Sequence, residues 1–193
     1  EEYVGETKYE DNKVVFSGTA FQPRTFSVRL KENASLEMPE NHSIDIECNA
    51  SALTVDEFSM SGDFDGEGNS FAAELMPDVV EAGGITFRME NNPADYNYIR
   101  CDGQTITLPE KHGYTKCYLL VTSSHGDRKA SFQVDGKDYS FNIPFYSGFI
   151  GQWGWKGESE GYMKDASIAY VGTHRHSSRA GGNESYIYTY LYK

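Results

Sequence analysis

The sequence has few cysteines, few basic residues and no long apolar segment, and each shortage excludes a class of protein. Its 193 residues contain three cysteines, Cys48, Cys101 and Cys117, which are too few for a disulfide scaffold. Lys and Arg total 17 against 29 Asp and Glu, so the formal net charge is −12. We therefore expect neither nucleic acid nor an anionic membrane as a partner, because no basic patch is available to neutralise phosphates. No apolar run approaches the roughly 20 residues that a membrane-spanning helix needs.

The cysteines also lack the C-x-x-C spacing of a zinc or redox motif. Cys48 alternates with Ile44 and Ile46 in an expected strand, and Cys117 opens the apolar run CYLLV. We expect both cysteines to be small buried side chains, and a Cys101–Cys117 disulfide stays an open alternative.

Catalytic motifs are scarce as well. The nucleophile motif G-x-S-x-G does not occur in the sequence. A glycosidase needs two carboxylates that face each other across a cleft, and the 29 acidic residues do not single out such a pair. We assign no catalytic residue.

Short alternating segments dominate the rest of the chain, and period-2 alternation of apolar and polar residues is typical of β-strands. Strands at this spacing, separated by turn residues, predict an all-β fold, an antiparallel β-sandwich or jelly roll. One helix is expected, over Ser70–Met76, ended by Pro77. The expected strands are Ile85–Met89, Tyr98–Cys101, Gln104–Leu108, Cys117–Thr122, Ala130–Val134, Lys137–Phe145, Ala166–Val171 and Tyr186–Tyr192.

Three local patterns are specific enough to test. Asp135-Gly136 lies between two alternating runs and predicts a two-residue hairpin turn, in which both residues need positive φ. The apolar run Leu119–Val121 predicts a central strand covered on both faces. Tyr186, Tyr188, Tyr190 and Tyr192 are expected on one face of the last strand.

The N-terminal part of the chain predicts a separate unit. Residues 1–12 are polar and expected to fray, and alternating residues in 13–31 predict a β-hairpin, with a linker up to Pro39. One strand pair is only marginally stable by itself, so we assign residues 1–50 to the end of a preceding β domain plus a linker. Residues 51–193 are assigned to the sandwich.

An acidic loop nearly fits the twelve-residue calcium motif. Asp63, Asp65, Glu67 and Glu74 occupy positions 1, 3, 5 and 12, and Gly68 is position 6. Position 5 is Glu rather than Asp or Asn, and no helix precedes the loop. A calcium site and a solvated acidic turn both stay open.

The C-terminal stretch holds the candidate binding residues. Trp153 and Trp155 lie on a loop between strands, and flat aromatic rings on a β scaffold suit a sugar-binding surface, although aromatic rings also fill β cores. His174 and His176 lie two residues apart and face the same way on an extended chain. They could hold a metal, but no third or fourth ligand is evident nearby, which favours a polar pair at a strand end. The candidate carbohydrate-binding residues are Trp153, Trp155, Tyr162, His174, Arg175 and His176.

Several segments, in this order, resemble the C-terminal β-sandwich region of bacterial α-mannosidases of glycoside hydrolase family 38. FSGTAFQPRTFSVRL resembles the last hairpin of the β domain that follows the catalytic barrel of this family. FDGEGNSFAAELMP, CDGQTITLP and CYLLVTSSHGD resemble the appended sandwich, and FYSGFIGQWG and AYVGTHRHS its closing strands.

The resemblance implies a non-catalytic accessory domain with a galactose-binding-like jelly roll that buttresses the catalytic domain of the parent polypeptide. The alternative is a carbohydrate-binding module for mannose-containing glycan. The resemblance places zinc in the catalytic barrel, which these residues do not contain, so calcium is the one candidate cofactor of this chain. We expect a periplasmic or secreted, soluble protein.

Overall fold

The computed structural model describes residues 8–10, 13–15, 41–108, 114–152, 162–164 and 166–193. The chain divides into two compact units, Glu1–Glu40 and Asn41–Lys193. The domain boundary expected between residues 50 and 51 stays a prediction. No helix of the described residues is long and apolar enough to cross a membrane.

In the first unit, β1 (Lys8–Glu10) pairs with β2 (Lys13–Val15) in an antiparallel hairpin, with Lys8 opposite Val15. The expectation that all of residues 1–12 fray is therefore wrong, because Lys8–Glu10 supply the partner strand. The rest of the predicted hairpin, residues 16–31, lies outside the described residues.

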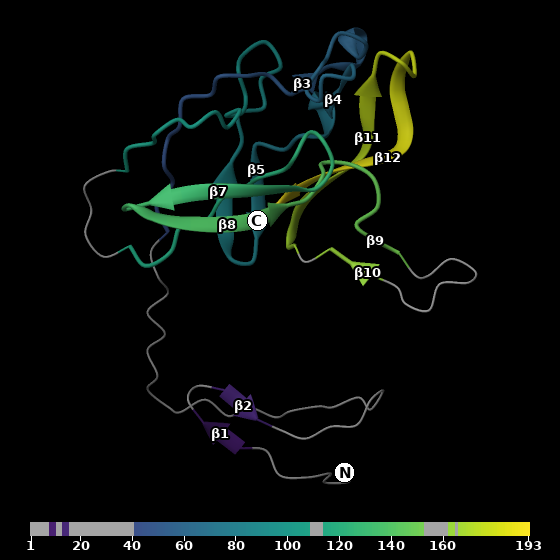
Figure 1. The fold of residues 1–193 in the computed structure, drawn as a ribbon. Helices are drawn as coiled ribbons and strands as arrows, with labels where there is room; N and C mark the ends of the chain where they lie inside the picture. Colours follow the sequence, from purple (N-terminus) through teal and green to yellow (C-terminus); the bar gives the residue numbers. More distant parts are fainter. Residues whose placement is uncertain (1–7, 11–12, 16–40, 109–113, 153–161, 165) are drawn as a thin grey trace, which may run out of the picture. The chain divides into compact units, whose positions relative to one another are not determined.

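The second unit is built around a four-stranded sheet in the order β12-β11-β4-β3. Its strands are β3 (Leu53–Thr54), β4 (Asn69–Ala72), β11 (Ile168–Ser177) and β12 (Gly182–Tyr192). Figure 1 shows β11 and β12 as the long yellow hairpin at the end of the chain. β11 pairs antiparallel with β12 and with β4, whereas β3 and β4 are parallel.

The other named strands among the described residues of this unit form three two-stranded pairs. β5 (Val79–Ala82) pairs with β6 (Ile85–Arg88), β7 (Arg128–Val134) with β8 (Lys137–Ile143), and β9 (Gly151–Gln152) with β10 (Tyr162–Met163). Asp135 and Gly136 have φ of 49° and 75° and join β7 to β8, which confirms the predicted hairpin turn. The all-β prediction is also confirmed.

Other local predictions are wrong. Ser70–Met76 is not one helix: β4 ends at Ala72, and one 3-10 turn, η2 (Ala73–Leu75), follows it before Pro77. Leu119–Val121 forms no central strand; Val121 makes a single bridge to Tyr192, and Leu119 is exposed.

The strand expected around Cys48 is not formed either. Ile44 and Ile46 are exposed, and Cys48 is half-buried in irregular chain. Cys117 is exposed, and all three cysteines are free thiols.

A β-bulge separates the four tyrosines of β12. The pairing with β11 shifts between Gly172 and His174, which lie opposite Thr189 and Ser185. Tyr190 and Tyr192 are buried, whereas Tyr186, with φ of 65°, is 84% exposed. The extra residues of a bulge interrupt the alternation of a strand, so one common face is not formed.

The core centres on aromatic rings. Phe64 makes edge contacts with Phe71, Tyr98 and Tyr146, with ring centroids 5.2 to 5.3 Å apart. Edge-to-face pairs at this separation add to the free energy gained from burial alone. These rings therefore join β4, the loop before it and the chain that follows β8.

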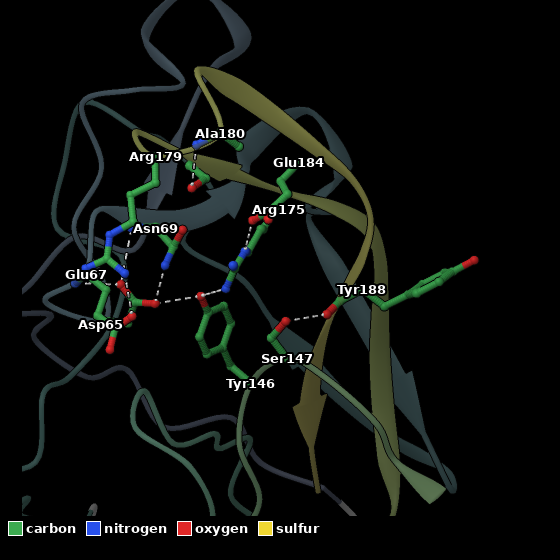
Figure 2. A network of polar contacts seen from close by, with 11 residues as sticks. Asp65, Glu67, Asn69, Tyr146, Ser147, Arg175, Arg179, Ala180, Glu184 and Tyr188 are labelled. Atoms are coloured by element: carbon green, nitrogen blue, oxygen red, sulfur yellow. Dashed lines mark hydrogen bonds and ion pairs between the residues drawn. The ribbon is translucent and has the colours of Figure 1, made fainter. Parts of the chain in front are cut away.

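A buried polar network crosses this core (Figure 2). The Asp65 carboxylate, 3% exposed, accepts hydrogen bonds from the backbone N–H groups of Glu67 and Asn69, from the Asn69 amide at 2.7 Å and from the Tyr146 hydroxyl at 2.9 Å. Arg175 donates to the Tyr146 oxygen at 3.2 Å and to Glu184 at 2.6 Å. A buried carboxylate with all its acceptor sites in use is stable in the ionised form.

The network shifts the pKa values of Asp65 and Tyr146 in opposite directions. Burial pushes the pKa of Asp65 upwards, but the hydrogen bonds from Asn69, Glu67 and Tyr146 together leave it below its usual value. Burial, followed by the charge of Asp65, raises the pKa of Tyr146. The phenol therefore stays a hydrogen-bond donor to the carboxylate.

Replacing Asp65 with Asn should destabilise the fold at neutral pH. An amide group at this place would face donors, and an unsatisfied buried donor costs about 1–3 kcal/mol. The pKa of Asp65 is lowered by folding, so its stabilising contribution is present above the unfolded value of about 3.9 and is lost as pH falls through the folded value. Urea unfolding should therefore show a wide gap between wild type and D65N at pH 7 and a narrower one near pH 3. Asp45→Asn, at an exposed position, is the control, and a D65N variant as stable as wild type at pH 7 would contradict the prediction.

Candidate metal centre

Four side chains that could each offer one metal ligand meet at one end of the four-stranded sheet. They are Asp56, Glu74, His174 and His176, and their ligand atoms all lie within 4.8 Å of one another. Glu74 Oε1 is 3.0 Å from His176 Nε2 and 3.2 Å from His174 Nε2. Asp56 Oδ1 is 3.3 Å from His176 Nε2. Two imidazoles and two carboxylates thus face a common point.

Strand register places the two carboxylates together. In the parallel pair, Leu53 lies opposite Phe71 and Thr54 opposite Ala72. Asp56, in the 3-10 turn η1 (Asp56–Phe58), and Glu74, in η2, each follow the last paired residue by two positions. Because parallel strands end at the same edge of a sheet, the two turns carry their carboxylates to the same place.

The two histidines come from β11, the strand on the other side of β4. His174 and His176 are two residues apart, so their side chains share a face of the strand, with ring centroids 5.5 Å apart. His176 is paired with Ser70 of β4 and is fully buried, at 0% exposure. The antiparallel β11–β4 register thus brings the imidazoles to the turn that bears Glu74.

Polar neighbours hold these side chains in place. Thr54 Oγ1 lies 2.8 Å from His176 Nδ1 and 2.6 Å from Ser70 Oγ, so the Nε2 side of the ring is directed at Glu74 and Asp56. The Asn183 amide donates to Asp56 Oδ1 at 2.8 Å. This hydrogen bond, with contacts to Glu74 and His176, lowers the pKa of Asp56.

The spacing of the ligand atoms suits a small divalent ion. Zinc binds His nitrogen and carboxylate oxygen at about 2.0–2.2 Å, and the edges of a tetrahedron with such bonds measure about 3.3–3.6 Å. Three of the contacts in the cluster, at 3.0, 3.2 and 3.3 Å, are already near that length. Imidazole and carboxylate ligands together also suit cobalt, nickel and iron.

The residues singled out from the sequence fall into different places. His174 and His176 meet as expected of residues on one face, but Arg175 lies on the opposite face, in the network with Tyr146 and Glu184. Trp153 and Trp155 lie outside the described residues. Tyr162 begins β10 opposite Gln152, and its side chain is also outside the described part. The carbohydrate-binding set stays a prediction.

The residues of the acidic loop do not gather around one point. Asp63 accepts the Gly68 N–H at 2.8 Å, the oxygens of Asp65 are taken up by the buried network, and Glu67 pairs with Arg179 at 3.2 Å. Glu74 lies instead with the histidines. The calcium assignment stays a prediction, and an ion bound by Asp65 would have to displace hydrogen bonds that exist without it.

Asp56 and Thr54 were not identified from the sequence. The pair of histidines gave half of the cluster, and Glu74 was assigned to a different site. Asp56 and Glu74 meet because β3 and β4 pair in parallel. These strands have only two and four residues, so the sequence carries no local pattern that would reveal the pairing.

Comparison with known families gives one match: the sequence model of the AziU2-like beta-sandwich domain family covers residues 40–193. This span contains all four residues of the cluster, and it confirms the predicted β-sandwich. It shows no link to glycoside hydrolase family 38 or to α-mannosidases. No curated protein matches the chain.

Calcium should leave the melting temperature unchanged, because the oxygens of Asp65 already accept hydrogen bonds from four donors. The measurement is a thermal scan in millimolar calcium against a calcium-selective chelator, repeated on Glu67→Gln, which alters an exposed member of the loop. A calcium-dependent rise in wild type that is absent from E67Q would place an ion in the loop and contradict the expectation.

Proposed function

We propose that this chain, which belongs to the AziU2-like beta-sandwich domain family, binds a divalent metal ion of the zinc class at Asp56, Glu74, His174 and His176. The observation that carries the proposal is the buried His176 ring. Its Nδ1 atom is held by Thr54, and its Nε2 atom faces Glu74 at 3.0 Å and Asp56 at 3.3 Å. Metal-bound histidines commonly have their second ring nitrogen fixed in this way by a polar partner.

Charge also supports an ion over simple ion pairs. Without a metal, neutral imidazoles can donate Nε2–H to the carboxylates, but they do not balance the two negative charges of Asp56 and Glu74. A divalent cation balances both carboxylates directly and binds neutral imidazole.

The ion would join segments that are far apart in the sequence. Asp56 and Glu74 follow β3 and β4, whereas His174 and His176 lie on β11, about a hundred residues further on. A bound metal therefore ties β11 to the two turns that follow β3 and β4. Because a metal that binds only the folded state stabilises that state, we assign the ion a role in the stability of the sandwich.

Zinc should bind with a stoichiometry of one per chain and raise the melting temperature. At a hundredfold excess over the dissociation constant, binding adds about 2.7 kcal/mol, which is roughly 5–10 °C for a domain of this size. The measurements are elemental analysis after dialysis and a thermal scan with zinc against chelator. His174→Ala and Glu74→Gln should lose the zinc-dependent shift, and Thr54→Val should weaken binding by roughly 10- to 100-fold.

His125→Ala is the matched control, since His125 is exposed and lies outside the cluster. Equal zinc binding by H174A, E74Q and wild type would overturn the proposal. So would the absence of any zinc-dependent shift in wild type.

The sequence resemblance supports a second, more specific proposal for the role of the domain. On that basis, the domain would be an accessory part of an α-mannosidase-like enzyme in carbohydrate metabolism, with the catalytic domain or mannose-containing glycan as its partner and a periplasmic or secreted location. The family match supports the β-sandwich alone.

If the chain binds glycan, Trp153 and Trp155 should carry most of the affinity, because binding free energy tends to concentrate in a few aromatic residues. Trp153→Ala and Trp155→Ala should each weaken binding to a mannose-rich glycan array at least about tenfold, near 1.4 kcal/mol. Unchanged affinity in both folded variants would place the glycan site elsewhere.

A further inference from the structure

A groove opens beside the metal centre. It has a volume of about 520 Å³, which lies within the range of small-molecule sites. Two of the four cluster residues, Asp56 and Glu74, line it, together with Val55, Glu57, Asn91 and Pro93. The groove and the metal centre therefore share two carboxylates.

The four ligands differ in how far they are exposed, and the exposed ones are those on the groove. The side chains of Asp56 and Glu74 are 61% and 34% exposed, whereas His176 is fully buried and His174 is mostly covered. The histidines do not line the groove. An ion held between the two pairs has the sheet behind it and the groove in front, so a molecule in the groove can reach it.

The charge of the groove restricts what can bind there. Asp56, Glu57 and Glu74 contribute three negative charges, and no Lys or Arg is among the described residues that line the groove. A divalent ion leaves a formal sum of −1, from three negative and two positive charges. This residual negative charge repels anions, most strongly at low ionic strength.

The polar groups of the groove are hydrogen-bond acceptors. The Asn91 amide nitrogen donates to Asp78 Oδ1 at 2.7 Å and to the Met76 carbonyl at 3.4 Å. Its oxygen receives no hydrogen bond from the described residues and is available to a ligand, as is the carboxylate of Glu57. Val55 and Pro93 supply apolar surface for a carbon skeleton.

We propose that this groove is a ligand site whose occupant is a small, neutral or positively charged molecule rich in hydroxyl or amino groups. One hydroxyl oxygen of the ligand binds the metal, and other hydroxyl or ammonium groups donate to Glu57 and Asn91. This inference rests on the proposed metal binding, and it adds an exchangeable coordination position on the groove side.

The test uses the full chain loaded with cobalt(II), whose visible absorption changes when a ligand enters its coordination sphere. Three probes have the same pyranose ring and different charges: glucosamine, glucose and glucuronate, titrated at low ionic strength because salt screens exposed charges. Glucosamine should bind most tightly and glucuronate at least about tenfold more weakly than glucosamine. A carboxylate is an ordinary ligand for such metals, so weak binding of glucuronate would reflect the charge of the groove.

Glu57→Gln separates the groove from the metal centre, because Glu57 is not a member of the cluster. The variant should bind cobalt as wild type does and lose most of the preference for glucosamine over glucose. Glu81→Gln, an equal change of charge at an exposed position of β5, should keep that preference.

The outcomes are distinguishable from those of the metal proposal. Failure to bind cobalt or zinc at all overturns both. Cobalt binding with a spectrum that none of the three probes changes overturns the groove site alone. Tightest binding by glucuronate, or a preference that E57Q leaves intact, overturns the assigned class of ligand.

Discussion

The buried carboxylate of Asp65 is the constraint on which the arrangement of the site depends. It accepts the Tyr146 hydroxyl, and Arg175 bridges that hydroxyl to Glu184 of β12. Since side chains alternate along a strand, holding Arg175 on one face of β11 fixes His174 and His176 on the other. The network therefore orients the histidines without touching them, and the loop that resembles a calcium motif has a structural role through Asp65.

The second constraint is the parallel register of β3 and β4. It places Asp56 and Glu74 at equivalent positions beyond Thr54 and Ala72, and the same Thr54 holds the ring of His176. A shift of β3 by one residue would turn its side chains to the other face of the sheet. Thr54 would then no longer reach His176, and Asp56 would no longer stand level with Glu74. The candidate centre is thus a consequence of register rather than of any single loop.

The sequence predicted local features well where one pattern decides the structure. Asp135-Gly136 specifies its turn because both residues must take positive φ, and the spacing of His174 and His176 specifies a shared face. It failed where distant packing decides. The apolar run Leu119–Val121 does not enter a sheet, and the first part of the expected helix, Ser70–Ala72, belongs to β4, which pairs with β11 and β3. Asp56 could not be predicted, because its partners lie 18 and about 120 residues away along the chain.

All of these contacts lie within residues 41–193, and so do the four residues of the cluster. The candidate metal centre therefore lies wholly within the sandwich unit, which is also the part that the family match covers. The exposure of the four side chains follows from their place in the fold. His176 is buried and His174 mostly covered because β11 is central in its sheet, between β12 and β4, whereas the carboxylates lie on turns beyond the strand ends. An ion bound there would be held by the sheet on one side and open to the groove on the other. With this asymmetry, the proposed centre would both stabilise the fold and present a coordination position to a ligand.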